Sequence, residues 1–196
     1  MSNRPLRNAA FRFRSRVMSR ARSFRRRRQP NLPPNANLIT PQLIVGGFID
    51  YDDWRQLVLE GVSVVVSLQA ERHDEEVFQD LQPEGYLRLP TTDFSPPTVA
   101  QLRMGAAFID QAVATGKIVL IHCHAGVGRS AMQCAAYLVY KGMSLEGAWE
   151  LLASKRPIVH LNEGQRVGLE AYAAQLAAER DNHPPLEDEP PLPLVS

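Results

Sequence analysis

An apolar run that ends at a cysteine and leads through a glycine-containing loop to an arginine constrains this chain most. The segment reads Val119-Leu-Ile-His-Cys123-His-Ala-Gly-Val-Gly-Arg129-Ser130. The apolar residues before Cys123 predict a buried strand, and the pattern after Arg129 predicts a helix. A loop that opens a helix points several backbone N–H groups inward, which favours a bound anion. The segment therefore predicts a nucleophile and an oxyanion site within the eight residues from Cys123 to Ser130.

The residue types in this loop suit chemistry on phosphate. A cysteine attacks as the thiolate, and nearby helix N-termini and cations favour that form. An arginine adds a planar fork that can hold two phosphate oxygens together. Gly126 and Gly128 give the backbone the freedom to let a phosphate approach closely. Residues 123–130, the phosphate cradle of this article, therefore predict nucleophilic attack on a phosphoester.

The cradle resembles the signature of the protein tyrosine phosphatase superfamily, His-Cys-x5-Arg-Ser/Thr, and matches it from His122 to Ser130. The resemblance implies that Cys123 forms a phosphocysteine and that Arg129 clamps the phosphoryl oxygens. It also implies that Ser130 donates to the sulfur when Cys123 leaves, although a serine there can equally cap a helix. His122 is expected to order the loop. The positions expected to bind the substrate phosphate are His124, Ala125, Gly126, Val127, Gly128 and Arg129.

The resemblance also assigns residues outside the cradle. The superfamily takes its general acid from an aspartate loop some 30 residues before the cysteine, and Asp93 precedes Cys123 by 30 residues. Asn162 lies in an Asn-acid-Gly run like the one that braces the cradle in dual-specificity phosphatases. Without the resemblance, Asn162 is simply a good helix cap. Gln165 is expected to position water, as a glutamine does in some relatives.

The chain resembles the compact, atypical dual-specificity branch of that superfamily. The Trp-Pro-Asp run of tyrosine-specific members is replaced by Thr91-Thr92-Asp93, and Cys123 lies far from the N-terminus, unlike in the low-molecular-weight branch. The branch implies a phosphatase for phosphotyrosine, phosphoserine or phosphothreonine in proteins. The alternatives are a lipid phosphomonoester phosphatase of the phosphatidylglycerophosphate or phosphoinositide type, and a phosphate-binding pseudophosphatase. The pseudophosphatase is disfavoured because all three catalytic candidates are present.

Strand and helix patterns alternate along the chain, which predicts a single α/β domain with a mostly parallel central sheet flanked by helices. A site then belongs at the carboxyl ends of the strands, where Cys123 lies. The strands are expected at residues 42–45, 62–68, 86–89 and 118–121. Helices are expected at residues 52–59, 98–115, 129–141, 144–153 and 162–179, with a short acidic helix or loop at 74–82.

Charge separates the ends of the chain from its centre. Residues 1–49 hold eleven arginines and no acid, although the whole chain has a net charge of +1. We expect a basic arm and a Pro/Asn linker at 1–36, a catalytic domain at 37–180 and a flexible acidic, proline-rich tail at 181–196. The linker pattern itself runs from Pro30 to Pro41. The apolar stripe of residues 1–29 fits a helix on an anionic membrane, a targeting segment or a disordered tail.

Composition bounds the remaining expectations. No run of 18 apolar residues predicts a spanning helix. The two cysteines, Cys123 and Cys134, fit a reducing, cytoplasmic compartment, with the protein peripheral at a membrane if the arm binds lipid. Cys134 is expected to be buried and inert, with a disulfide to Cys123 as the minority alternative. We expect no metal, no cofactor, no nucleic-acid partner and no obligate oligomer.

Overall fold

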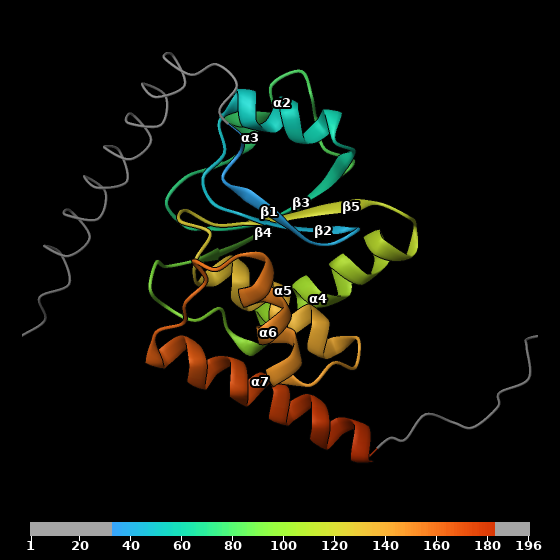
Figure 1. Cartoon of the computed structure of the whole chain (residues 1–196), viewed down its shortest axis with the longest axis vertical. Helices are drawn as coiled ribbons and strands as arrows, with labels where there is room; N and C mark the ends of the chain where they lie inside the picture. Colours follow the sequence, from blue (N-terminus) through green and yellow to red (C-terminus); the bar gives the residue numbers. More distant parts are fainter. Residues whose placement is uncertain (1–32, 183–196) are drawn as a thin grey trace, which may run out of the picture.

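The computed structural model describes residues 33–182, which form a five-stranded sheet covered by helices on both faces (Figure 1). The strand order is β1-β2-β5-β3-β4, and only the β1–β2 pair is antiparallel. The strands are β1 (Ala36–Thr40), β2 (Leu43–Gly46), β3 (Val62–Gln69), β4 (Gly85–Thr91) and β5 (Ile118–His122). The expected α/β class and mostly parallel sheet are therefore confirmed.

One face of the sheet is covered by more helices than the other. The helices are α2 (Tyr51–Leu59), α3 (Glu75–Phe78), α4 (Val99–Ala114), α5 (Arg129–Tyr140), α6 (Leu145–Lys155) and α7 (Glu163–Asn182). In Figure 1, α2 and α3 lie on one side of the sheet and the other four lie on the opposite side. Two apolar clusters correspond to these two layers, and the larger one contains α4, α5, α6 and α7.

Local sequence signals set most helix starts. The Thr98 hydroxyl accepts from the backbone of Gln101, and the Gln101 side chain accepts from the backbone of Thr98. This capping box satisfies two N–H groups that the first turn of α4 leaves unpaired, and it was expected from the sequence. Ser144 caps α6 in the same way through the backbone N–H of Gly147. These caps explain why the predicted starts of α4 and α6 agree with the structure.

The structure differs from the prediction by one missed strand and at several element ends. Residues 36–40, expected within the linker, form β1, because antiparallel pairing with β2 overrides a local sequence rich in Pro and Asn. Strand β4 extends to Thr91 through Pro90, which an edge strand tolerates because one side needs no ladder hydrogen bonds. Helix α7 continues to Asn182, two residues into the predicted tail. The basic arm and most of the acidic tail lie outside the described residues.

The central strand β5 positions the site. It pairs with β2 on one side and with β3 on the other, and its last four residues are buried. The parallel strands β2, β3, β4 and β5 all end at the same edge, where the loops after them meet. Among residues 33–182, no helix is long and apolar enough to cross a membrane.

Candidate active site

The cradle lies between the end of β5 and the start of α5, as predicted. Cys123 directly follows β5 and is 2% exposed. The backbone N–H of Gly126 donates to its Sγ at 3.3 Å, and the Ser130 hydroxyl lies 3.3 Å from the same atom. Ser130 Oγ also lies 3.2 Å from the carbonyl of Gly46, and its single proton can go either to this carbonyl or to the sulfur. The sulfur therefore faces into the cradle, where the N–H of Gly126 stabilises negative charge and the hydroxyl can join it by turning away from Gly46.

Arg129 is buried at the first position of α5, and one edge of its guanidinium is anchored. Nη1 donates to the carbonyls of Thr91 and Leu68 at 2.7 and 3.3 Å, and to the Glu71 carboxylate at 3.0 Å. Nη2 lies 2.9 Å from Asp93 Oδ1, an ion pair without hydrogen-bond geometry. Within residues 33–182, Nε and Nη2 therefore have no hydrogen-bond acceptor. This edge, which the Asp93 ion pair shares, has the fork geometry that can hold two oxygens of a phosphate.

The charges around Arg129 decide its ionisation. Burial alone would lower the pKa of Arg129, but the negative charges of Cys123, Glu71 and Asp93 outweigh it and raise that pKa. The guanidinium therefore stays charged at every pH at which the protein works. Two carboxylates already share this charge in the protein alone.

The structure brings Asp93 to the cradle. Its loop begins where β4 ends at Thr91, whose carbonyl accepts from Arg129. The next residue, Phe94, is 70% exposed and has a φ of 62°, a conformation that bulky residues rarely adopt. The Asn162 side chain holds this turn by donating to the Phe94 carbonyl at 2.8 Å. The position of Asp93 therefore fits the predicted general acid, whose catalytic role stays a prediction.

Asn162 and Gln165 both lie at the start of α7, but their side chains reach different surroundings. Asn162 Oδ1 accepts from the backbone N–H of Gln165 at the start of α7, so Asn162 caps this helix and holds the Asp93 loop. None of its hydrogen bonds within the described residues reaches the cradle, where the resemblance had placed it. Gln165 lies over Gly128, because a Cβ on that glycine would meet Gln165 Oε1 at 2.7 Å. Gln165 therefore reaches the cradle, as a water-positioning residue must.

Sequence reasoning missed two charged residues of the site. Glu71 follows β3 by two residues, so it lies at the same sheet edge as Cys123 and anchors Arg129. The pairing of β3 with β5 was the signal that could have found it. Arg156 follows α6, and its Nε donates to the Gly126 carbonyl at 2.7 Å. Arg156 begins the segment 156–165, which resembles the loop that supports the cradle in dual-specificity phosphatases, but Arg156 itself was not singled out, because 30 residues separate it from Gly126.

Two histidines flank Cys123 and have different surroundings. His122 is fully buried, and its Nε2 lies 3.2 Å from Asp74 Oδ2. Burial alone would raise the pKa of Asp74, but the charge and hydrogen bonding of His122 outweigh it and lower that pKa. His122 therefore pairs with Asp74 next to Cys123, and its role in ordering the loop after β5 stays a prediction. Burial lowers the pKa of His124, so this cradle residue is neutral at pH 7.

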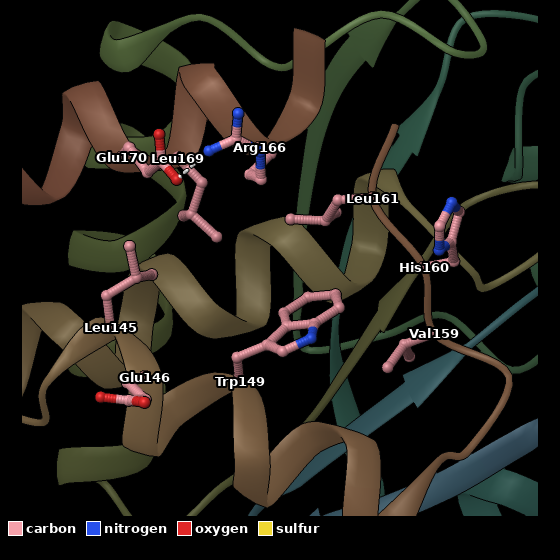
Figure 2. A pocket seen from close by; sticks show the side chains of 9 residues that line it. All are labelled: Leu145, Glu146, Trp149, Val159, His160, Leu161, Arg166, Leu169 and Glu170. Carbon is pink, nitrogen blue, oxygen red and sulfur yellow. Dashed lines mark hydrogen bonds and ion pairs between the residues drawn. The ribbon is translucent and has the colours of Figure 1, made fainter. Parts of the chain in front are cut away.

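An apolar groove between α6 and α7 lies beside the site but does not form it. Trp149, Leu161 and Leu169 are among the residues that line it (Figure 2). None of the residues that line this groove belongs to the cradle. The loop that borders the groove contacts the cradle through the backbone N–H of His160, which donates to the Val127 carbonyl at 3.1 Å.

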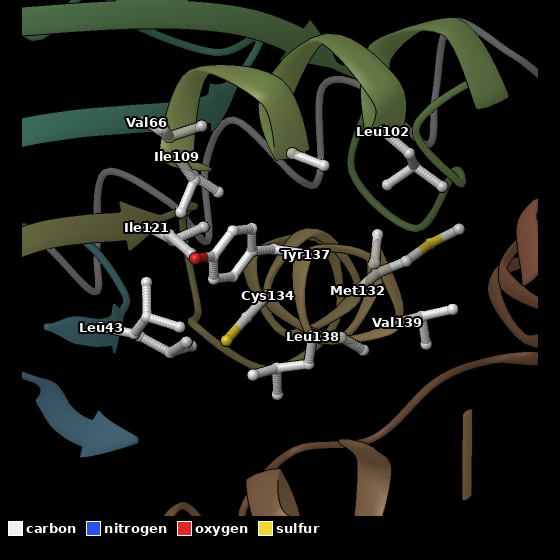
Figure 3. Close-up of a cluster of buried hydrophobic side chains, with 14 of the residues drawn as sticks. Leu43, Val66, Leu102, Ile109, Ile121, Met132, Cys134, Tyr137, Leu138 and Val139 are labelled. Atoms are coloured by element: carbon white, nitrogen blue, oxygen red, sulfur yellow. The ribbon is translucent and has the colours of Figure 1, made fainter. Parts of the chain in front are cut away.

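The second cysteine belongs to the core. Cys134 is completely buried on α5 among Leu43, Ile121 and Tyr137 (Figure 3). Burial raises the pKa of its thiol to about 12. Both cysteines are free, so the expectation of a buried, inert thiol agrees with the structure.

Comparisons with known proteins agree with this geometry. The model of the family "Dual specificity phosphatase, catalytic domain" matches residues 52–175. Human dual specificity phosphatase 28 is 29% identical over 178 residues, which are 89% of this chain and 96% of that protein. Human dual specificity protein phosphatase 12 is 32% identical over 139 residues, 69% of this chain and 41% of that protein.

Similarity extends to a lipid-directed relative and to solved structures. Phosphatidylglycerophosphate phosphatase PTPMT2 of Arabidopsis thaliana is 29% identical over 145 residues, 69% of this chain and 61% of that protein. The crystal structure of PTPMT1 in complex with PI(5)P superposes with a TM-score of 0.68 and 28% identity, over 74% of this chain and 98% of the other. Human DUSP28 superposes with a TM-score of 0.64 and 28% identity, over 74% and 97%.

The family-model match covers the region that holds the cradle, Asp93 and Arg156, and the two solved structures named above have the same fold. A buried sulfur beneath N–H donors and an arginine with a free fork are the parts that a cysteine-dependent phosphoric monoester hydrolase requires. The chain therefore belongs to the dual-specificity phosphatase family, within the protein tyrosine phosphatase superfamily.

Proposed function

We propose that this enzyme removes phosphate from phosphotyrosine, phosphoserine and phosphothreonine residues of proteins. One observation carries the proposal: Nε and Nη2 of the buried Arg129 have no hydrogen-bond acceptor among the described residues, beside the inward-facing sulfur of Cys123. A phosphoryl group seated there meets a bidentate donor and a nucleophile together. The backbone N–H groups of the cradle supply further donors.

The first chemical step uses Cys123 and Asp93. The sulfur attacks phosphorus, the S–P bond forms and the bond from phosphorus to the leaving oxygen breaks. Asp93, acting as the general acid, gives a proton to that oxygen. The phosphate takes the place of the Asp93 carboxylate at Nη2 of Arg129, which lies 2.9 Å away in the protein alone. Substrate binding therefore releases Asp93 toward the leaving group.

The second step returns the enzyme to its starting state. Water attacks phosphorus and gives a proton to the Asp93 carboxylate, while the S–P bond breaks and Cys123 leaves as a thiolate. The Ser130 hydroxyl, 3.3 Å from Sγ, stabilises the departing sulfur. Gln165, placed over Gly128, is in position to orient the water.

The charge of the cradle favours protein over inositol-lipid substrates. Positions 124–128 hold no lysine or arginine to meet additional phosphates. His124 does not replace one, because burial lowers its pKa and leaves it neutral at pH 7. The cradle therefore suits a substrate with one phosphate group.

A phospholipid with a single phosphomonoester is the second candidate. The similarity to PTPMT2 and to the PTPMT1 complex supports it. The eleven arginines of residues 1–49 give a segment that an anionic membrane attracts. In this version the enzyme is a cytoplasmic protein that works at a membrane surface.

A substrate panel tests the proposal. The full chain is given phosphotyrosine, phosphoserine and phosphothreonine peptides, and vesicles of phosphatidylcholine that contain phosphatidylglycerophosphate or PI(5)P. Released phosphate is measured for the wild type, Cys123→Ser and a variant that lacks residues 1–29. We expect the peptides to be the better substrates, and Cys123→Ser to lose at least about 10⁴-fold in kcat.

The panel also separates the alternatives. Turnover of vesicles alone, reduced when residues 1–29 are removed, replaces the protein reading with the lipid reading. Binding of phosphate without turnover of any substrate indicates a pseudophosphatase. Turnover by Cys123→Ser would contradict the phosphocysteine mechanism in either case.

A further inference from the structure

A second arginine lies buried beneath the cradle. Arg156 is 2% exposed and donates from three nitrogens. Its Nε donates to the Gly126 carbonyl at 2.7 Å, Nη1 to Asn37 Oδ1 at 2.6 Å and Nη2 to Asn35 Oδ1 at 2.8 Å. All three acceptors are neutral. The structure therefore fixes this guanidinium in place without cancelling its charge.

The absence of a carboxylate distinguishes Arg156 from Arg129. Arg129 pairs with Glu71 and Asp93, so its charge is shared by two acids before any substrate binds. Arg156 forms no ion pair with any residue of the range 33–182. A buried charge is strongly unfavourable unless an opposite charge or good hydrogen bonds compensate it. A nearby anion is therefore expected to face Arg156.

The connection from Arg156 leads to the sulfur of Cys123 through one residue. Gly126 accepts from Arg156 with its carbonyl at 2.7 Å and donates with its N–H to Sγ at 3.3 Å. A Cβ on Gly126 would lie 2.4 Å from Arg156 Nη2, so the guanidinium packs directly against this residue. Burial lowers the pKa of Arg156, and the interaction with Cys123 opposes this lowering only in part.

We propose that Arg156 is a positioning residue that supplies a second buried positive charge for the Cys123 thiolate, and that Asn35 and Asn37 hold it because they are neutral. The inference rests on the proposed phosphatase function and deepens it. Arg129 grips the substrate, and Arg156 places a second positive charge one residue away from the nucleophile. A carboxylate in place of either asparagine would cancel the charge that the thiolate requires.

The reaction of the thiol with iodoacetamide tests this without any substrate. The rate is measured from pH 4 to pH 9 on the full chain carrying Cys134→Ala, so that only Cys123 reacts. Added to this background, Arg156→Met should move the midpoint of the pH profile up by about one unit, which makes the reaction roughly tenfold slower below the midpoint. Arg156→Lys keeps the charge and should restore most of the profile.

Asn37 offers a matched pair of variants that keep Arg156. The only side-chain hydrogen bond of Asn37 within the described residues is the one that its Oδ1 accepts from Arg156 Nη1, and an aspartate can accept it equally well. Asn37→Asp should shift the midpoint upward by less than Arg156→Met, roughly threefold in rate, because Asn37 is exposed and solvent screens the added charge. Asn37→Ala removes the hydrogen bond without adding charge and should leave the midpoint in place.

The outcomes separate charge from structure. Equal midpoints in Asn37→Asp and the wild type, with both proteins showing the same thermal unfolding, would overturn the proposal. A shift in Asn37→Ala as large as in Asn37→Asp would also overturn it, because position alone would then explain the effect. The expected shifts in a protein that hydrolyses no phosphoester would support the role of Arg156 and refute only the proposed function.

Discussion

Two buried arginines place positive charge at the cradle, and their partners differ. We call the side that holds Arg129 the rim of the cradle and the side that holds Arg156 its underside. On the rim, Arg129 pairs with the carboxylates of Glu71 and Asp93, and it keeps one edge of its fork without an acceptor. On the underside, Arg156 is held only by neutral oxygens. A group that must exchange partners with substrate suits acids that a phosphate can displace. A permanent support suits neutral partners, which leave its charge available to the sulfur.

The largest loss of activity is expected at Asp93, the rim carboxylate that we propose as the general acid. Asp93→Asn should lower kcat/KM by about 10³-fold for an alkyl phosphate such as phosphoserine, because its leaving oxygen needs a proton. The loss should be far smaller for 4-nitrophenyl phosphate, whose leaving group needs little assistance. Steady-state kinetics on both substrates measure this, and equal losses would argue against Asp93 as the general acid.

The underside of the cradle can be tested by adding a Cβ at Gly126. Gly126 has a φ of 71°, and a Cβ there would meet Arg156 Nη2 at 2.4 Å and the backbone nitrogen of Gly47 at 2.6 Å. Gly126→Ala should therefore displace the N–H that faces the sulfur and lower kcat/KM by about 10²-fold.

Gly116→Ala is the matched control for this variant. Gly116 has a similar φ of 78°, but a Cβ there has nothing within 4 Å. It should lower the free energy of unfolding by about 1–2 kcal/mol through backbone strain alone and leave kcat/KM unchanged. Similar kinetics in the two variants would show that the underside tolerates displacement, and that strain alone sets the effect.

A smaller loss of activity is expected at Glu71, the rim carboxylate that anchors the Arg129 side chain. Glu71→Gln keeps an acceptor for Nη1 of Arg129, and the carbonyls of Thr91 and Leu68 still hold the same nitrogen. We expect kcat/KM to fall about tenfold, because Arg129 loses part of its fixed orientation. Glu84→Gln, which removes an exposed ion pair with Lys117, should leave turnover unchanged. An inactive Glu71→Gln would instead place this residue among the reacting groups.

The smallest effect on activity is expected in the core. Burial raises the pKa of Cys134 to about 12, so its thiol stays protonated at neutral pH and does not react. Cys134→Ala should leave kcat/KM and the alkylation profile of Cys123 unchanged.

The Cys134 thiol should also make the free energy of unfolding depend on pH, and its contribution should fall as the pH rises. An exposed cysteine in the unfolded chain ionises near pH 8.5, well below the folded value, so its contribution to stability is fully present below that pH. It is lost as the pH rises toward 12, and the loss should be absent in Cys134→Ala. Urea unfolding at pH 7, 9 and 10 measures the difference, and parallel curves for the two proteins would contradict it.

Prediction from sequence succeeded where neighbours in the chain act together. The cradle holds its nucleophile, N–H donors and arginine within eight residues, so a local pattern carries the whole arrangement. The capping box at Thr98 and Gln101 is local in the same way. Strand β1 was missed because it is stabilised by pairing with β2. The local sequence, rich in Pro and Asn, does not indicate that pairing. The resemblance indicated a supporting role for Asn162 but not which loop its amide reaches, so that role stays a prediction.

The sequence by itself determined the α/β class, the nucleophile and the clamp, because strand, loop and helix follow one another directly around Cys123. Only the tertiary structure decided how the surrounding charges pair. It added Glu71 and Arg156 to the site, and it showed that Asp93, which the resemblance had indicated, lies against Arg129. Glu71, Asp93 and Arg156 lie 58, 36 and 30 residues from their partners in the cradle. Electrostatic interaction depends on distance in space, and the order of the strands sets that distance.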